Sequence, residues 1–423
     1  MDCVLKDLIS ISKDGEWGKG EPFDESVEML AIRGTDFEDV RFGNTASTPR
    51  RHIPKHIAER KLLKPWDLII EAAGGTKNQI TGRTVLLRPQ LFFRSKLPLT
   101  CASFSRFIRF NTEHCDPEFM FWYLQHLYAS GSMHAYHTQH TGVARFQWTT
   151  FSEREPLSLP PLPIQRRIAG ILSTYDELIE NSQRRIRILE TMARALYREW
   201  FVHFRFPGHE THPRVPSPLG DIPKGWEMKT IADVCESVSY GYTASASREE
   251  VGPKFLRITD IVPATIDWAG VPFCEIPEDK ALKYLLKHGD IVVARTGATT
   301  GYAKRLNKLH PDTVFASYLV RVRAKASVSN RMLGIVMESD EYKQYIQTNI
   351  GGAAQPQANA VVLTSMRLAM PPPSVGEMFD RLIAPMIDEA ELLAVKIQNL
   401  RRTRDLLLPR LLSGQVELEG CNG

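Results

Sequence analysis

The sequence lacks the features that mark several classes of protein. None of its 423 residues lies in an apolar run close to the roughly 18 to 20 residues of a membrane helix, and its first residues lack the layout of a signal peptide. Its six cysteines form no Cys-x-x-Cys pair, so we expect free thiols rather than a zinc knuckle or disulfide framework. With 43% hydrophobic and 24% charged residues, the composition is typical of a folded globular protein, which we expect in the cytoplasm and not at a membrane.

Catalytic and cofactor motifs are also missing. The chain has no Asn/Asp-Pro-Pro-aromatic motif with a glycine-rich cofactor loop, which a DNA adenine methyltransferase needs. The glycines Gly297 and Gly301 lack the lysine of a phosphate-binding loop. The spacing of His134, His137 and His140 could suit a metal, but no carboxylate or cysteine lies nearby to complete a ligand set. We therefore expect no catalytic residue, no cofactor and no metal on this chain.

Positive charge is concentrated in two segments, although the formal net charge is only +4. Residues 1–40 hold four Lys/Arg against eleven Asp/Glu, whereas residues 41–110 hold fourteen against three. Residues 290–331 hold eight against two. Basic segments interleaved with Ser, Thr, Asn and Gln suit a surface that follows DNA phosphates and reaches base edges. A solvated basic face is the alternative for either segment alone.

The chain contains a long-range repeat. Leu157-Ser-Leu-Pro-Pro-Leu-Pro163 corresponds to Leu368-Ala-Met-Pro-Pro-Pro-Ser374 at an offset of 211 residues, and a long helical pattern follows each copy. In both helices the apolar positions step by four and three, which is typical of a coiled-coil seam. Ser182 and Arg404 are polar exceptions, and Pro385 predicts a kink or restart in the second helix. The predicted seam comprises Tyr175, Ile179, Ile186, Leu189 and Leu196, facing Met386, Leu393, Ile397, Leu400 and Leu407.

The segments upstream of the two helices also correspond. Asp67–Gly75 matches Asp290–Ala298, each a buried strand that runs into a glycine-bearing loop. Cys101-Ala-Ser-Phe104 matches Phe315-Ala-Ser-Tyr318, each at the start of another strand. Between the halves, residues 206–218 are rich in proline and predict a stiff linker.

Several of these stretches resemble the specificity subunits of type I restriction-modification systems. The resemblance is carried by the following segments: 159–172, 186–204, 219–226, 256–261, 289–297 and 316–319. It implies an α+β fold with two similar α/β target-recognition domains, separated by two long antiparallel coiled-coil helices in a pseudo-twofold repeat. The implied boundaries are target-recognition domain 1 at 1–163, the central long helix at 164–205, the linker at 206–218, target-recognition domain 2 at 219–373, the distal long helix at 374–412 and a tail at 413–423.

The resemblance further implies a non-catalytic subunit that reads a two-part sequence in double-stranded DNA. Its partners would be two modification subunits that methylate adenine and restriction subunits that translocate and cleave DNA. S-adenosylmethionine, ATP and Mg²⁺ would then be bound by these partners. From charge and loop position, the residues expected to contact DNA are Ser47, Arg50, Arg51, Lys77, Asn78, Arg83, Arg145 and Gln147 in the first half, and Tyr242, Arg248, Lys254, Arg295, Thr296, Thr299, Lys304, Gln355 and Gln357 in the second.

Two other classes of function remain open from the sequence. The chain could be a coiled-coil scaffold or adaptor that does not bind DNA, or an orphan DNA-binding decoy. A single-chain nuclease or methyltransferase is disfavoured by the missing motifs. Positively charged segments at equivalent places in both halves favour the DNA-binding hypothesis.

Overall fold

The computed structural model describes residues 2–74, 79–139, 143–218, 220–263, 265–350 and 357–416. The chain forms two compact units, of which unit 1 comprises Met1–Glu180 with Leu400–Gly423 and unit 2 comprises Asn181–Asn399. Among the described residues, no helix combines the length and the apolar character that crossing a bilayer requires.

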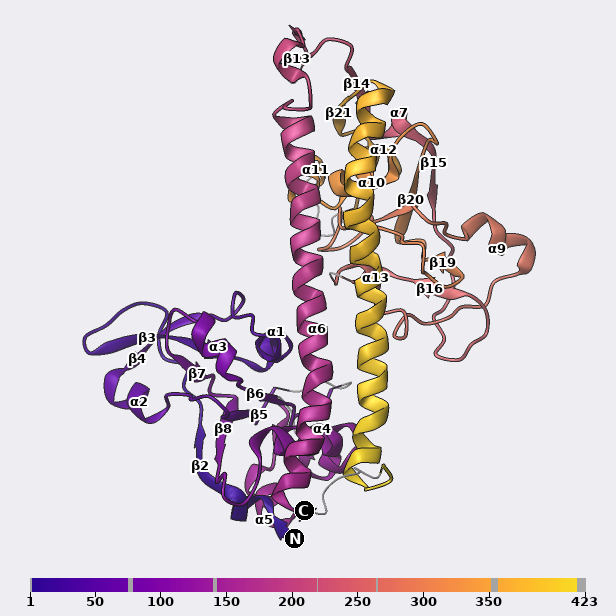
Figure 1. The fold of residues 1–423 in the computed structure, drawn as a ribbon. Helices are drawn as coiled ribbons and strands as arrows, with labels where there is room; N and C mark the ends of the chain where they lie inside the picture. Colours follow the sequence, from indigo (N-terminus) through magenta and orange to yellow (C-terminus); the bar gives the residue numbers. More distant parts are fainter. Residues whose placement is uncertain are drawn as a thin grey trace. The chain divides into compact units, whose positions relative to one another are not determined.

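Unit 1 is built around a four-stranded antiparallel sheet with the order β2-β8-β5-β6 (Figure 1). A second sheet has the order β4-β3-β7, in which β3 and β7 are parallel. A helix, α4, packs its aromatic face onto the first sheet, and strands β1 and β11 pair beside it. The strands are β1 (Asp2–Val4), β2 (Ile9–Asp14), β3 (Ser26–Ile32), β4 (Arg50–Pro54), β5 (Leu68–Glu71), β6 (Thr84–Leu86), β7 (Leu99–Cys101), β8 (Ser105–Phe110), β9 (His137–Thr138), β10 (Arg145–Phe146) and β11 (Pro156–Ser158). The short helices are α1 (Phe37–Arg41), α2 (Lys55–Arg60), α3 (Pro89–Arg94), α4 (Pro117–Ala129) and α5 (Trp148–Arg154).

Unit 2 repeats this arrangement. Its four-stranded antiparallel sheet has the order β15-β20-β17-β18, and its parallel pair is β16 with β19. Strands β14 and β21 pair as β1 and β11 do in unit 1. The strands are β12 (Arg214–Val215), β13 (Ile222–Pro223), β14 (Glu227–Thr230), β15 (Cys235–Tyr240), β16 (Lys254–Leu256), β17 (Ile291–Ala294), β18 (Ala303–Arg305), β19 (Thr313–Phe315), β20 (Leu319–Ala324) and β21 (Arg367–Met370). The short helices are α7 (Ile231–Val234), α8 (Ile258–Ile261), α9 (Glu278–Tyr284), α10 (Asn330–Met337), α11 (Asp340–Asn349) and α12 (Ala360–Thr364).

A buried aspartate at the start of the central strand is pinned by an arginine in the same way in both units. Asp67 accepts two hydrogen bonds of 2.7 Å from Arg109 on β8. Asp290 accepts two hydrogen bonds of 2.7 Å from Arg323 on β20. Both aspartates are at most 1% exposed, and such a bidentate pair holds two neighbouring strands in one register.

A close approach of two backbone segments is duplicated as well. A Cβ added at Gly15 would lie 2.1 Å from the carbonyl oxygen of Ala102, and one added at Gly241 would lie 2.2 Å from that of Ala316. No side chain fits at such distances, so glycine is required at both places. The strands β2 and β15 therefore end against the turns that precede β8 and β20.

The two long helices are α6 (Leu162–Tyr197), which continues into a π-helical turn at Arg198–Val202, and α13 (Pro373–Leu412) (Figure 1). Each unit contains one end of each helix. The restart predicted at Pro385 is wrong, because α13 is one helix of 40 residues. Buried Phe379 and Ile383 before this proline, and partly buried Met386 and Ile387 after it, pack in one apolar cluster of unit 2, which stabilises the helix on both sides of the proline.

In unit 1 the helices pack against each other around a buried group of charges. Asp176 on α6 is 1% exposed and lies 2.6 Å from Arg404 on α13 and 2.9 Å from Arg41 on α1. Arg88 approaches the same carboxylate at 3.8 Å. The guanidinium groups of Arg41 and Arg404 also lie over the ring of Trp122, at 5.0 and 5.5 Å from its centroid. The polar seam position Arg404 is therefore compensated by Asp176, which joins α6, α13 and the α/β part of unit 1.

In unit 2 the corresponding contact is apolar. Ala193 on α6 is buried in a cluster with Phe379 and Ile383 of α13 and the rings of Trp200 and Phe201. An exposed ion pair of 2.6 Å between Arg185 and Glu389 also joins the helices. Along each unit, residues that come later in α6 contact residues that come earlier in α13. The two helices are therefore antiparallel within each unit.

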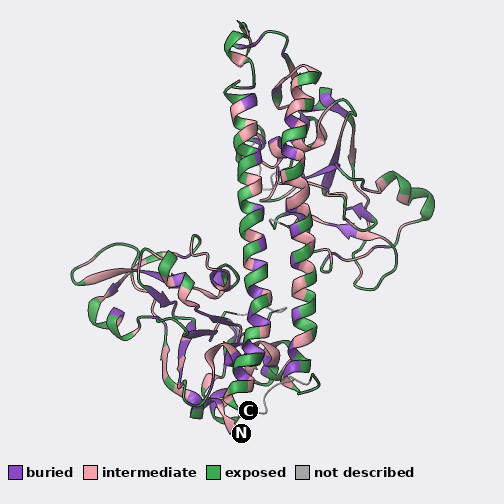
Figure 2. Ribbon diagram, in the orientation of Figure 1, coloured by how far each residue is buried: buried purple, intermediate pink, exposed green. Residues whose placement is uncertain are grey.

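Burial follows the predicted seam only in part. Ile179, Ile186, Leu393 and Ile397 are buried, whereas Tyr175, Leu189, Leu196, Met386, Leu400 and Leu407 are half-buried. Exposed positions run along the remaining faces of the long helices, and the central strands of both units are buried (Figure 2). Which seam residues face each other stays a prediction.

The predicted fold class is confirmed: two similar α/β domains, repeated in one order of elements, are each joined to two long antiparallel helices. The domain boundaries stay a prediction, because compact units are defined by packing and divide both helices. The proline-rich segment 206–218 contains a short strand, β12, and its Phe206 packs on Trp226. The five described cysteines are free thiols, as predicted.

Candidate nucleic-acid interface

Three backbone segments meet at one end of the central strand in unit 1, and we call this place junction 1. The backbone N–H groups of Ala72 and Ala73, just after β5, donate to the carbonyl of Phe104 at 2.8 and 3.1 Å. The N–H of Phe146 donates to the carbonyl of Ala72 at 2.9 Å, and Ala73 forms a bridge with Arg145. Hydrogen bonding therefore brings the loop after β5, the turn before β8 and the segment before α5 together.

Junction 2 has the same construction in unit 2. The N–H of Arg295, just after β17, donates to the carbonyl of Tyr318 at 3.0 Å. The N–H of Ala358 donates to the carbonyl of Arg295 at 2.9 Å, and Thr296 forms a bridge with Gln357. The two junctions share a backbone framework and differ in the side chains that it carries.

This framework sets a correspondence between the halves that sequence matching did not predict. The bridges Ala73–Arg145 and Thr296–Gln357 align Arg145 with Gln357. Gln147 then corresponds to Asn359, and each is the residue that precedes a helix, α5 or α12. The side-chain oxygen of Asn359 accepts a hydrogen bond of 2.9 Å from the Val362 N–H, so this side chain stabilises the start of α12.

Junction 1 presents two predicted residues to solvent. Arg145 and Gln147 are exposed and line a hollow of about 680 Å³ together with Phe104, Arg106 and Trp148. Arg106 is bound to Asp14 at 2.5 Å and lies over the Trp148 ring. Within the described part of the chain, the guanidinium of Arg145 has no carboxylate partner, which leaves it available to a ligand.

Junction 2 presents a different set. Arg295 is half-buried and lies over the ring of Tyr240, 5.0 Å from the centroid. Its Nε is buried and has no hydrogen-bond partner among the described residues. Thr296 is half-buried and Gln357 is exposed, beside it on the bridge. Stacking on an aromatic ring holds the guanidinium group of Arg295 in place, and among the described residues it has no carboxylate partner.

Three predicted contact residues are instead engaged within the protein. Arg83 binds the carboxylate of Glu71 at 2.7 and 2.9 Å. Arg51 donates to two backbone carbonyls and lies over the Trp17 ring at 4.4 Å. Lys254 donates to a backbone carbonyl at 2.7 Å. These cations orient surface strands, and their role in DNA contact stays a prediction.

The remaining predicted residues are dispersed. Exposed Ser47 lies with its hydroxyl 3.3 Å from the Asp39 carboxylate, and Arg50 is 72% exposed with a 3.6 Å pair to Glu28. Tyr242 packs on another tyrosine ring, Arg248 is exposed, and Thr299 lies in the turn after junction 2. The predictions for Lys77, Asn78 and Gln355 lie outside the described residues.

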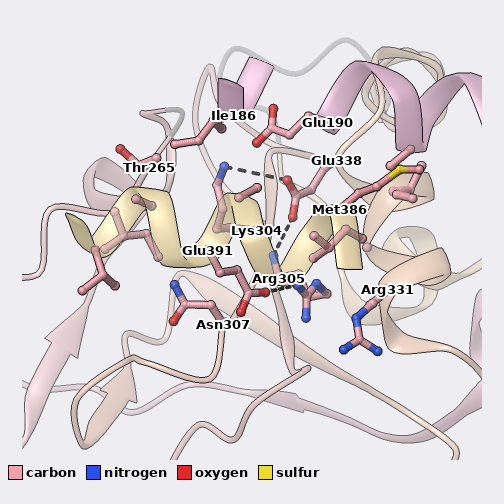
Figure 3. Close-up of a pocket in the computed structure, with 18 of the residues that line it drawn as sticks. Ile186, Glu190, Thr265, Lys304, Arg305, Asn307, Arg331, Glu338, Met386 and Glu391 are labelled. Atoms are coloured by element: carbon pink, nitrogen blue, oxygen red, sulfur yellow. Dashed lines mark hydrogen bonds and ion pairs between the residues drawn. The ribbon is translucent and has the colours of Figure 1, made fainter. Parts of the chain in front are cut away.

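Lys304 is half-buried and lines a small cavity of about 150 Å³ in unit 2 (Figure 3). Its amino group is 3.8 Å from Glu338, and the adjacent Arg305 pairs with Glu391 of α13. Residues from β18, α10 and both long helices line this cavity, and its cations are paired with carboxylates of unit 2. The role of Lys304 in DNA contact stays a prediction.

Aromatic residues at the junctions were not predicted as contacts. Phe104 and Tyr318 are each 60% exposed at equivalent places, and Tyr240 supports Arg295. The match between Cys101–Phe104 and Phe315–Tyr318 was a usable signal, but it was interpreted as the start of a strand. Among the described residues, no group of three or more His, Cys, Asp or Glu is placed to hold a metal ion.

Comparison with known proteins adds three observations. Residues 87–191 match the family model described as the type I restriction modification DNA specificity domain. The MjaVIII and MjaIX specificity subunits of Methanocaldococcus jannaschii type I restriction enzymes are 24% and 25% identical over 292 and 305 residues, covering 67% and 70% of this chain and 67% and 69% of theirs. The crystal structure of the type I restriction-modification S subunit from M. genitalium has the same fold, with a TM-score of 0.56 at 11% identity over 97% of this chain and 95% of that one.

The repeated α/β framework, the two helices and the paired junctions define a protein with two similar domains, each joined to the long helices. In sequence over about two thirds of its length, the chain is similar to specificity subunits of type I restriction-modification systems.

Proposed function

We propose that this subunit reads a two-part DNA sequence, with junction 1 contacting one half-site and junction 2 the other. The observation that carries the proposal is the shared backbone framework of the junctions, which carries different side chains in the two units. Ala73 and Arg145 in the first correspond to Thr296 and Gln357 in the second. A shared framework with different exposed donors and acceptors suits the recognition of two different short sequences.

The chemistry of these side chains supports base contacts. An exposed arginine can donate two hydrogen bonds to the O6 and N7 of guanine, and a glutamine can bind the N6 and N7 of adenine in the major groove. Arg145 and Gln357 have these capacities at corresponding positions. The surrounding lysines and arginines of residues 41–110 and 290–331 would contact phosphates and supply most of the salt-dependent affinity.

We assign the rest of the system to partners. Two modification subunits would dock on the long helices and bind S-adenosylmethionine to methylate adenine. Restriction subunits would bind ATP and Mg²⁺ and cleave unmodified DNA, such as that of a phage. This chain would itself hold no cofactor and act in the cytoplasm as the non-catalytic subunit of the methyltransferase and endonuclease complex.

The test is selection of duplexes from a random-sequence library by the purified full-length chain, with methylated adenines mapped in cells that have or lack its gene. We expect one target with two specified half-sites and an unspecified spacer in the selection, and loss of methylation at that same sequence in the deletion. If the chain enriches no sequence and methylation is unchanged, the scaffold hypothesis replaces this one.

Replacement of Arg145 or Arg295 by alanine should impair one half-site each. Because a bidentate contact to a base contributes about 1 to 3 kcal/mol, we expect affinity for the selected duplex to fall by roughly 5- to 150-fold. The loss should disappear when the corresponding half-site is scrambled, as measured by fluorescence anisotropy at one fixed salt concentration.

Arg187→Ala is the matched control, since this exposed arginine of α6 lies in neither junction. It removes the same charge and should leave sequence preference unchanged. Arg145→Ala and Arg295→Ala variants that keep both affinity and half-site preference would contradict the assignment of bases to the junctions.

A further inference from the structure

Both junctions expose an aromatic ring at the same position of the framework, and junction 2 also exposes Tyr240, which supports Arg295. Phe104 and Tyr318 are both 60% exposed, whereas Phe107 and Phe315, close to them in sequence, are at most 1% exposed. Leaving a ring of this size in water forgoes the stabilisation that its burial would provide. Recurrence of the same exposure in two halves of low identity indicates that the exposed ring serves the common task of the junctions.

The support under each ring is rigid. The carbonyl of Phe104 accepts from two N–H groups of junction 1, and that of Tyr318 accepts from the N–H of Arg295. Two residues before each ring, the carbonyl groups of Ala102 and Ala316 lie against Gly15 and Gly241, where no side chain would fit. The main chain at both rings is therefore held in place before any ligand arrives, which reduces the entropic cost of using them.

The chemistry around the rings is that of a nucleic-acid surface. In junction 1, Phe104 shares its hollow with exposed Arg145 and with Val143, which is 52% exposed. In junction 2, Tyr318 is hydrogen-bonded through its backbone to Arg295. Aromatic faces beside cations and amides are the combination by which proteins stack on bases while holding the backbone. An apolar ring can also enter between base pairs and unstack one step.

We infer that Phe104 and Tyr318 are DNA-contacting residues that each stack on a base at one locally unstacked step of their half-site. The inference rests on the proposed function and specifies its contact mode. Adenine methylation by a partner requires that the base leave the duplex, and the resulting gap in the stack is a place for one ring in each half-site. The ring at this shared position, one in each junction, matches one such gap per half-site.

The probe for the test is the duplex selected by the full-length chain, together with a set in which each base is replaced in turn by an abasic site. The wild-type chain should bind more tightly when one particular base in each half-site is removed, because the gap is then already present. Phe104→Ala should abolish this gain in the half-site of junction 1, and Tyr318→Ala in that of junction 2.

On the intact duplex each alanine variant should bind about 5- to 100-fold more weakly, which is the effect of losing one stacked base. Phe104→Tyr and Tyr318→Phe should bind within about threefold of the wild type, since both rings retain a stacking face. Phe93→Ala is the matched control, because this ring is 87% exposed on α3 outside either junction, and it should have no effect.

The outcomes separate this inference from the proposed function. If Arg145→Ala and Arg295→Ala weaken binding while both ring variants bind as the wild type does, the rings are not contacts and the two-part reading stands. If all four variants bind as the wild type does, both proposals fail. Melting temperatures equal to that of the wild type are expected for the ring variants, since neither ring is buried.

Discussion

Asp176→Ala is expected to destabilise unit 1 by about 3 to 5 kcal/mol, since removing one partner leaves buried charges uncompensated. The carboxylate is 1% exposed and faces Arg41, Arg88 and Arg404, of which Arg41 and Arg404 bind it within 3.0 Å. The measurement is urea denaturation of the full chain, with hydrogen exchange to localise the loss to unit 1.

Glu389→Ala provides the control. Glu389 also joins α6 to α13, through Arg185, but the two side chains are 39% and 52% exposed. An exposed pair of this kind contributes about 0 to 1 kcal/mol, so the variant should be nearly as stable as the wild type. Equal effects of Asp176→Ala and Glu389→Ala would contradict the structural importance of the buried group.

The same cluster predicts a pH dependence. Burial by itself would raise the pKa of Asp176, but the attraction of Arg41 and Arg404 outweighs it and lowers the pKa below its ordinary value. Because a carboxylate with a lowered pKa in the folded state binds protons more weakly than in the unfolded state, its contribution is complete above the unfolded pKa of about 3.9. It is lost as the pH falls through the folded pKa. Stability of the wild type should therefore fall more steeply below about pH 4 than that of Asp176→Asn.

Asp67→Ala and Asp290→Ala should each destabilise their own domain by about 2 to 4 kcal/mol. Each change removes a buried acceptor of a bidentate arginine, although Arg109 and Arg323 are 25% and 22% exposed and can be partly hydrated. Hydrogen exchange should show the loss in β5 and β8 for the first variant and in β17 and β20 for the second.

Exposed ion pairs of the same units serve as controls. Glu153→Ala and Asp340→Ala disrupt the pairs with Lys6 and Lys343, and both should change stability by at most about 1 kcal/mol. If either buried-aspartate variant were as stable as its control, the repeated aspartate–arginine pair would not be needed to stabilise the fold.

The order of elements could be predicted from the sequence because the repeat preserves the residues that shape the backbone. Asp67 and Asp290 begin equivalent strands, and Cys101–Phe104 and Phe315–Tyr318 form equivalent turns. The segments that precede α5 and α12 could not be aligned in the same way. The bridge that places Arg145 opposite Ala73 depends on strand geometry, which residue similarity between the two loops does not show.

Charge counting located the basic segments but could not show which cations are free. Arg83 and Arg109 contribute to the excess of positive charge in residues 41–110, yet Glu71 and Asp67 bind them within the protein. Their partners are separated by 12 and 42 positions, and only the folded sheet brings them together. The role of Asp176 could not be predicted either. The seam pattern is defined by apolar residues, so it includes Tyr175 and gives no role to the adjacent carboxylate.

The buried charges of unit 1 make the helix contacts in that unit different from those in unit 2. At the repeat offset of 211 residues, Asp176 and Arg404 correspond to Ile387 and Ala193, which lie in the apolar cluster of unit 2. A protein assembled from two copies of the first half would oppose Asp176 with Ala193 of the other copy and leave the acid without its interhelical cation. The two halves are therefore not interchangeable along the long helices. A protein that paired two copies of the first half would need a cation in place of Ala193 to compensate Asp176.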